Sequence, residues 1–257
     1  MLTLEVLIEK LDDCPDRVKQ FTLGLLESTK CFETDLEPPE DVAGLLYDWH
    51  MGIIDEEIDE IPDFGPSNFP LQTTTFPAIP ANVSLVVGGL NGHNYITFDG
   101  SLEEGYTSAL AALVSPTFGL FHVLRNNAPV ADADFRLIMS AASNHQFGRI
   151  LGNANRGGLA GDVVSGTRVI PSGTWYIVYT EYNVSGTYFQ FINGTLDTSG
   201  VIATPDLNSL FLGFDNLGVE SPWIGGWART ILYDPPPSSA EIVSITNFLA
   251  ATYGIIL

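Results

Sequence analysis

Basic residues are scarce in this sequence. The chain of 257 residues contains 10 Lys and Arg against 31 Asp and Glu, which gives a formal net charge of -21 at pH 7. Because such a protein repels phosphate groups, the sequence argues against nucleic acid and against an anionic membrane surface as partners. Charged residues of both signs make up only 16% of the chain. That low share suits a β-protein whose surface is rich in Thr, Ser, Asn and Gly.

Cysteine is almost absent. The two cysteines, Cys14 and Cys31, cannot build a disulfide framework, and no Cys-x-x-Cys pattern is present. We expect two reduced thiols in a core; the alternative is one bridge between them.

Long hydrophobic runs are also missing. No window is long and apolar enough to cross a bilayer, so we expect no membrane insertion. The first residues, 1–5, lack the basic start and the apolar stretch of a signal peptide. We therefore expect no secretory route, and the Asn-x-Ser/Thr matches at Asn82, Asn183 and Asn193 carry little weight as glycosylation sites.

Patterns that carry catalysis do not stand out. No Gly-x-Ser-x-Gly elbow or phosphate-binding loop occurs, and the histidines are scattered without metal-binding spacing. Among them, His122 lies in an apolar stretch, and we expect it to be a core or rim histidine. The four histidines are His50, His93, His122 and His145.

Paired carboxylates of the glycosidase kind are equally hard to find. Such enzymes place acids alternately on one strand, so that two of them share a face. The nearest match, Glu57-Ile58-Asp59-Glu60, lacks the intervening residue and lies in an acidic stretch. We therefore predict that the protein is not an enzyme. Asp134, Asp162 and Glu181 are the remaining acids to check.

Residues 1–60 differ in composition from the rest of the chain. Residues 1–64 hold 18 acids and 4 bases, whereas residues 65–257 hold 13 acids and 6 bases. Apolar residues at helical spacing predict three short helices in residues 1–60, the third beginning at Pro38-Pro39 with Val42, Leu45, Leu46 and Trp49 on one face. Because about 60 residues is marginal for an independent core, we interpret this segment as a docking or oligomerisation module. The alternative is a small stabilising subdomain.

Residues 61–80 read as a connector that is rich in proline. At such a density proline favours an extended and fairly stiff chain. Several apolar residues follow the prolines, so an ordered connector that lies against the next domain is at least as well supported as a free linker. The prolines are Pro62, Pro66, Pro70, Pro77 and Pro80.

From residue 81 onward the pattern is one of short strands and turns. Apolar runs rich in β-branched and aromatic residues alternate with Gly and Asn pairs, which predicts a β-sandwich. The clearest candidate strands are 83–87, 95–98, 118–124, 175–180, 188–192, 210–212 and 227–234. A single helix closes the chain: Ser238 and Glu241 form a capping box, and Gly254 ends the helix.

The order of these elements resembles the laminin-G-like, or concanavalin A-like, jelly-roll sandwich. The resemblance covers about residues 83–257. It rests on Asn94–Ser101, on Gly173-Thr174-Trp175-Tyr176-Ile177-Val178, on the strand that ends in Ile192-Asn193-Gly194, and on the closing strand and helix from Trp227 to Gly254. It implies a mainly β fold: an antiparallel jelly-roll sandwich, with a small helical segment before it and one helix after it.

The resemblance is less specific for function. Sandwiches of this kind occur in adhesins, in secreted glycan-active enzymes and in bacteriophage virion proteins. It implies a non-enzymatic structural protein of a larger assembly, such as a head decoration or tail-fibre component of a virion. The acidic segment would contact other virion proteins, the protein would form a homo-oligomer (a trimer by analogy), and the sandwich would bind a host surface glycan. The alternatives are a stand-alone carbohydrate-binding lectin, extracellular or cytoplasmic, and a glycoside hydrolase.

Glycan binding needs exposed aromatic rings and amide or guanidinium groups, and two predicted loops offer them. Trp223, Asp215 and Asn216 belong to one loop, and Asn153 and Arg156 to the other. The alternative for Trp223 is that it packs on the edge of the sandwich.

No cofactor is expected, and calcium is the one metal for which loop ligands exist. Those ligands are Asp99, Asp215 and Asn216, and their alternative role is turn formation.

Overall fold

The computed structural model describes residues 38–51, 60–73, 83–100, 105–109, 117–127, 139–141, 146–147, 149–151, 156–159, 164–183, 186–201, 209–213 and 223–257. The chain divides into two units, Met1–Glu37 and Pro38–Leu257. All of the described residues belong to the second unit. The two helices predicted before residue 38, together with Cys14 and Cys31, lie outside the described residues.

The described part of the second unit is a β-sandwich closed by one helix, as the sequence predicts. Its largest sheet has eight strands in the order β15-β14-β13-β7-β17-β5-β4, with β1 added beside β17, and all pairs are antiparallel. These strands are β1 (Leu45–His50), β4 (Ser84–Leu90), β5 (His93–Asp99), β7 (Phe118–Asn126), β13 (Trp175–Tyr182), β14 (Thr187–Ile192), β15 (Thr195–Val201) and β17 (Ile224–Tyr233).

A second sheet of six strands has the order β2-β3-β6-β16-β8-β9. Its strands are β2 (Glu60–Ile61), β3 (Leu71–Thr73), β6 (Tyr106–Ala109), β8 (Met139–Ala141), β9 (Gln146–Phe147) and β16 (Ser209–Leu212). A third, three-stranded sheet consists of β10 (Arg149–Leu151), β11 (Arg156–Leu159) and β12 (Val164–Val169). A short 3-10 turn, η1 (Pro39–Asp41), precedes β1.

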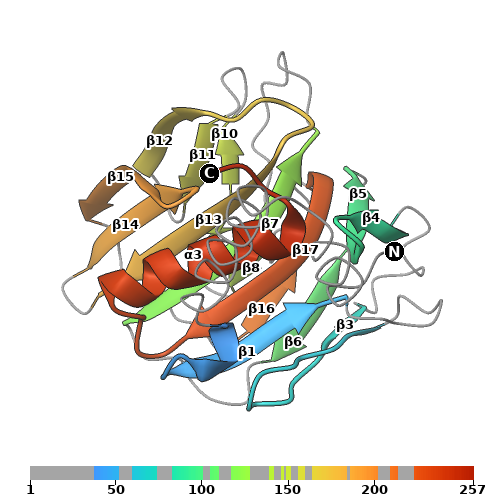
Figure 1. Cartoon of the computed structure of the whole chain (residues 1–257), viewed down its shortest axis with the longest axis horizontal. Helices are drawn as coiled ribbons and strands as arrows, with labels where there is room; N and C mark the ends of the chain where they lie inside the picture. The colour runs from blue at the N-terminus through green and yellow to red at the C-terminus, as the bar shows by residue number, and fades with distance from the viewer. Residues whose placement is uncertain are drawn as a thin grey trace, which may run out of the picture. The chain divides into compact units, whose positions relative to one another are not determined.

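Two apolar clusters hold these layers together. The first lies between the two large sheets and joins Leu120 and Trp227 of the eight-stranded sheet to Leu210 of the second sheet. The second cluster joins the outer face of the eight-stranded sheet to the closing helix, α3 (Ser239–Tyr253), which lies across that face (Figure 1). Strand β7 is buried on both faces because alternate side chains enter alternate clusters.

The closing helix agrees with the sequence in detail. The Ser238 side chain accepts a hydrogen bond from the Glu241 backbone, and the Glu241 side chain accepts one from the Ser238 backbone. The C-cap Gly254 adopts φ +67°, in the left-handed region where a side chain is disfavoured. Helix α3 is not long and apolar enough to cross a membrane, and no other helix in the described residues is either.

The predicted third helix is wrong. After η1, residues 45–50 form β1, which pairs with the second half of β17. The apolar residues there fit two periods: Leu45, Leu46 and Trp49 suit a helix, whereas Tyr47, Trp49 and Met51 alternate and enter the sandwich core. Burial against β17 decides in favour of the strand. Strands β2 and β3 likewise fall within or beside the predicted connector, so the sandwich includes described residues from Pro38 onward.

Candidate functional site

One row of residues crosses the eight-stranded sheet near the end of β7. Trp175 of β13 lies opposite Arg125 of β7, Arg125 lies opposite Gly226 of β17, and Gly226 lies opposite Thr97 of β5. Since Phe121 and Val123 belong to the cluster under α3, Arg125 points to the same outer face of the sheet. This row places one cation and one indole side by side on that face.

The Arg125 guanidinium lies against two aromatic rings. Its Cζ atom is 5.2 Å from the centroid of the Tyr95 ring and 5.3 Å from that of Trp175. The two rings meet edge to face, with centroids 4.9 Å apart and planes at 79°. Both Arg125 and Trp175 are half-buried, whereas Tyr95 is buried. We call Tyr95, Arg125 and Trp175 the Arg125 cluster.

Glycines make room for this cluster. A Cβ on Gly226 would lie 2.6 Å from Cη2 of Trp175, and one on Gly225 would lie 1.9 Å from the carbonyl oxygen of Arg125. Gly225 also has φ +149°, which side chains rarely adopt. The Gly225-Gly226 pair therefore lets the indole lie across β17 and keeps it beside the guanidinium.

Such an arrangement suits a ligand with both apolar and oxygen-bearing surfaces. An indole face packs against the C–H face of a sugar ring, and it attracts a cation through its π electrons. A guanidinium donates hydrogen bonds in a fixed planar fork to ligand oxygens. The cluster combines both kinds of group on a rigid sheet.

The structure contradicts the predicted role of one site residue, Trp223, and leaves the side chains of the others undescribed. Trp223 is 0% exposed, belongs to the sandwich core, and donates its backbone N–H to Gly213. A buried ring cannot stack on a ligand, so its predicted binding role is corrected to packing. Arg156 lies in β11 between Leu151 and Val169, and its side chain is outside the described part. Asp215, Asn216 and Asn153 also lie outside the described residues.

The calcium site stays a prediction. Asp99 is exposed at the end of β5, while its predicted co-ligands in the 214–222 loop are not described. Among the described residues, no group of three or more His, Cys, Asp or Glu side chains could hold a metal ion.

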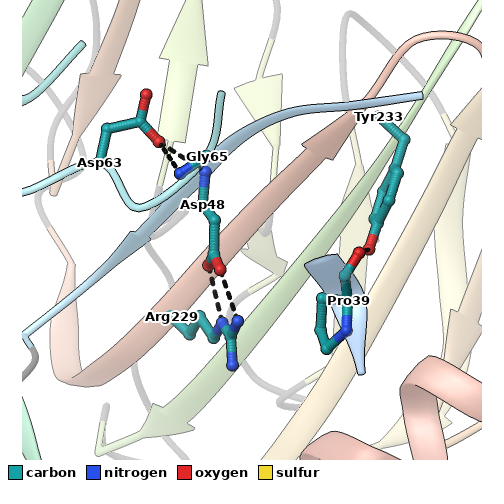
Figure 2. Close-up of polar contacts among 6 residues, drawn as sticks. All are labelled: Pro39, Asp48, Asp63, Gly65, Arg229 and Tyr233. Carbon is teal, nitrogen blue, oxygen red and sulfur yellow. Dashed lines mark hydrogen bonds and ion pairs between the residues drawn. The ribbon is translucent and has the colours of Figure 1, made fainter. Parts of the chain in front are cut away.

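The strongest polar contacts of the outer face are structural. Asp48 of β1 accepts from Nε of Arg229 at 2.7 Å and from a second guanidinium nitrogen, so the two buried side chains form a two-point ion pair (Figure 2). Burial acts to lower the pKa of Arg229, but the hydrogen bond and charge of Asp48 outweigh it and raise that pKa. A charge satisfied in this way is not available to a ligand.

Asp63 organises the turn beside β1. Its Oδ1 accepts from the backbone N–H groups of Asp48 and Gly65, each at 2.8 Å (Figure 2). Its Oδ2 accepts from the backbone N–H of Phe69, also at 2.8 Å. These three hydrogen bonds hold residues 63–69 against β1.

His122 is buried in the sandwich interior. Its Nδ1 lies 2.8 Å from Oγ1 of Thr230, which also accepts a hydrogen bond from Nε1 of Trp227. Burial lowers the pKa of His122 to about 3. The imidazole is therefore neutral at pH 7, and this histidine is a core residue, as the sequence suggested.

Glu181 is the one predicted acid that the structure describes. It faces the outer side of β13 and accepts a hydrogen bond from the Tyr179 hydroxyl at 3.1 Å. Burial raises its pKa, and the hydrogen bond from Tyr179 opposes that rise in part. Asp134 and Asp162 lie outside the described residues. Within the described part, the Tyr179 hydroxyl is the polar partner of Glu181, and no second carboxylate contacts it.

Arg125 and Trp175 were not among the predicted site residues. They are 50 positions apart in the sequence, and only the pairing of β13 with β7 brings them together. The available signal was local: Arg125 ends an apolar strand, where a cation is unusual, and Trp175 begins one.

No family model and no curated protein sequence matches this chain. Solved structures do match. The chain resembles domain 4 of AbnA, an extracellular arabinanase of Geobacillus stearothermophilus solved with arabinotriose, with a TM-score of 0.55 at 15% identity, over 80% of this chain and 99% of that one. It also resembles Trypanosoma rangeli sialidase solved with sialic acid, with a TM-score of 0.62 at 12% identity.

A third match is the receptor-binding domain of botulinum neurotoxin type G, with a TM-score of 0.58 at 11% identity over 80% of this chain. The fraction of each matched structure that this chain covers differs. The chain spans only 39% of the sialidase and 52% of the neurotoxin domain, but nearly all of the arabinanase domain. At these identities the likeness shows the fold alone, an antiparallel β-sandwich, which is consistent with the concanavalin A-like resemblance.

Proposed function

We propose that this protein is a non-catalytic glycan-binding β-sandwich, and that it serves as a component of a larger assembly of the virion type. The observation that carries the binding function is the Arg125 cluster. It places a half-exposed indole beside a guanidinium on the face of a rigid sheet, with glycine backbone beneath the ring. Aromatic stacking and fixed donors are what sugar recognition requires.

The comparisons support this proposal by analogy. Domain 4 of AbnA, which this chain matches over 99% of its length, was solved with arabinotriose. A matching structure of botulinum neurotoxin type C is described by the dependence of cell entry on interaction with two ganglioside molecules. Those ligands belong to those proteins, and the sugar bound by this chain is a separate question.

The test is a glycan array probed with the full chain. Trp175→Leu retains an apolar side chain over Gly226 but removes the ring. We expect it to weaken binding at least about tenfold, by analogy with the stacking of a nucleic-acid base on one aromatic ring, which is worth about 1–3 kcal/mol. The matched control is Phe64→Leu, which removes an exposed ring elsewhere and should leave binding unchanged. An array on which the folded full chain binds no glycan would contradict the proposal.

The absence of catalysis is part of the same proposal. Glycoside hydrolysis needs two carboxyl groups about 5–9.5 Å apart on the two sides of the scissile bond, whereas Glu181 contacts a tyrosine. Every glycan bound on the array should be recovered intact after long incubation. New reducing ends that disappear in Glu181→Gln would instead favour the hydrolase.

The place in an assembly rests on the resemblance to virion sandwiches and on the acidic first segment. In this proposal residues 1–37 contact other virion proteins or further copies of the chain, and the sandwich is displayed outward to a host surface glycan. A stand-alone lectin is the alternative. The two differ in whether the chain self-associates, which light scattering can measure.

A further inference from the structure

Arg125 differs from the other arginines whose side chains the structure describes. Arg229 is held by the Asp48 carboxylate. Arg168 donates to the carbonyl oxygen of Ile192 at 2.7 Å. The guanidinium of Arg125 contacts two aromatic rings, and its buried Nε has no hydrogen-bond partner in the described structure.

Arg125 has no acidic partner among the described residues, although acids outnumber bases in the chain by 31 to 10. Burying a polar group without a hydrogen bond is costly, and the cost is larger for a charged group. A partly buried cation that has no carboxylate partner among the described residues is therefore a group that gains from an added anion.

The surroundings define the shape of that anion. The Tyr95 and Trp175 rings meet edge to face, and both contact the guanidinium, which restricts its orientation. A fixed, planar fork of donors matches the two oxygens of a carboxylate better than it matches single hydroxyl groups.

The rest of the row is neutral and does not compete for the cation. Next to Gly226, Thr97 donates its hydroxyl to the carbonyl oxygen of Ser84 at 3.3 Å. The acid of β5 on the same face is Asp99, two positions further along and exposed.

We propose that the Arg125 cluster binds an acidic sugar, a sialic or uronic acid, with its carboxylate on the Arg125 guanidinium and its ring against Trp175. This inference rests on the proposed glycan-binding function and specifies the ligand class of the same site. It also accounts for how a chain of net charge -21 takes an anionic ligand, because the contact is made at one locally positive point.

The experiment measures binding of the full chain to matched probes: sialyllactose against lactose, and trigalacturonic acid against its neutral methyl ester. We expect the dissociation constant to be at least about tenfold lower for the acidic member of at least one pair. Adding NaCl to about 0.5 M should reduce this preference, because the contact is ionic.

Variants assign that preference to a residue. Arg125→Gln should abolish the preference for the acidic probe while leaving weak binding through Trp175. Arg125→Lys retains the positive charge but lacks the planar fork of donors, so it should keep only part of the preference for the acidic probe. The matched control is Arg168→Gln, which changes net charge equally at an exposed site away from the cluster and should preserve the preference. Thermal melting of each variant identifies any that fail to fold. If Arg125→Gln fails to fold, Arg125→Lys provides the test.

The outcomes separate the two proposals. Equal binding of acidic and neutral probes, or a preference that survives in both Arg125 variants, overturns the acidic-sugar inference and leaves glycan binding intact. No binding of any probe by the folded protein overturns both.

Discussion

Asp48 and Arg229 illustrate how single residues hold this sandwich together. We expect Asp48→Ala to cost about 3–5 kcal/mol of unfolding free energy, because it leaves the Arg229 cation buried and unpaired. Arg229→Met should lower the free energy of unfolding by a similar amount, because it leaves the Asp48 carboxylate buried and unpaired. The double variant should cost less than the sum of the two, since it removes both charges. Urea unfolding of the four proteins measures this, and additive costs would mean that the pair is not coupled.

His122 gives the protein a stability that depends on pH. Burial lowers its pKa from the ordinary 6.5 to about 3. Between these two pH values the imidazole is protonated in the unfolded chain and neutral in the folded chain. Stability should therefore fall as the pH falls from about 6.5 towards 3, by up to about 1.4 kcal/mol per pH unit from this group.

The test compares wild type with His122→Asn, which keeps a polar partner for Thr230. Between about pH 6.5 and 4.5 the wild type should lose about 2 kcal/mol more than the variant in urea unfolding experiments. His50, whose pKa burial and the Arg229 charge lower to about 4, acts in both proteins and cancels in the difference. Parallel pH profiles would contradict the assignment to His122.

At the same scale, the sequence identified residue types better than residue positions. It selected an exposed tryptophan as a sugar-stacking group, but Trp223 is buried and the half-exposed indole is Trp175. Both lie next to glycines and strand ends, so the local pattern does not distinguish them. Burial depends on which strands become neighbours, and the pairing of β7 with β13 and β17 joins residues that are 50 to 114 positions apart.

The elements of the fold were largely predictable, because each carries a strong local signal. Strand β7 is a continuous apolar run, β14 alternates, and α3 has a complete capping box and a terminal glycine. Strand β1 was not predictable. Its apolar residues fit a helical and a strand period alike, and the deciding factor is the open edge of β17, which lies about 180 residues later in the chain.

The position of β1 leads to a prediction about truncation. Removing residues 1–37 should leave the melting temperature within a few degrees of that of the full chain, because residues 38–257 form one unit and Tyr233 still donates to Pro39. Removing residues 1–50 should destabilise the sandwich severely. Tyr47 and Trp49 are fully buried, and losing each costs about 3–5 kcal/mol.

The measurement is thermal unfolding by circular dichroism. The shorter truncation should melt like the full chain, whereas the longer one should melt at least about 10 °C lower or aggregate. Asp48 is lost only in the longer truncation, so Arg229→Met in that background should recover part of the stability. Two truncated proteins with the same melting temperature would mean that β1 is dispensable.

For the whole molecule, the structure changes how the acidic charge is divided. Residues 1–64 contain 18 acids, but 9 of these lie in residues 38–64, which belong to the second unit. Residues 1–37 contain the other 9 acids and 4 bases, a net charge of -5. The segment available for docking is therefore shorter and less acidic than composition alone suggested, and like-charge repulsion between copies of it is modest.

Self-association through residues 1–37 is the prediction that separates an assembly component from a stand-alone lectin. We expect light scattering on the full chain at about physiological salt to give a multiple of 27.8 kDa, about 83 kDa for the trimer suggested by analogy, and the chain without residues 1–37 to be a monomer. Repulsion between the acidic segments is screened by salt, so the full chain should dissociate first at low ionic strength. If the shorter chain keeps the same multiple, the interface lies in the sandwich, and the edge strand β15 with its exposed Leu196 and Val201 is where to search for it. If both proteins are monomers, self-association is excluded and the first segment either docks on a different chain or has no assembly role, which favours the lectin.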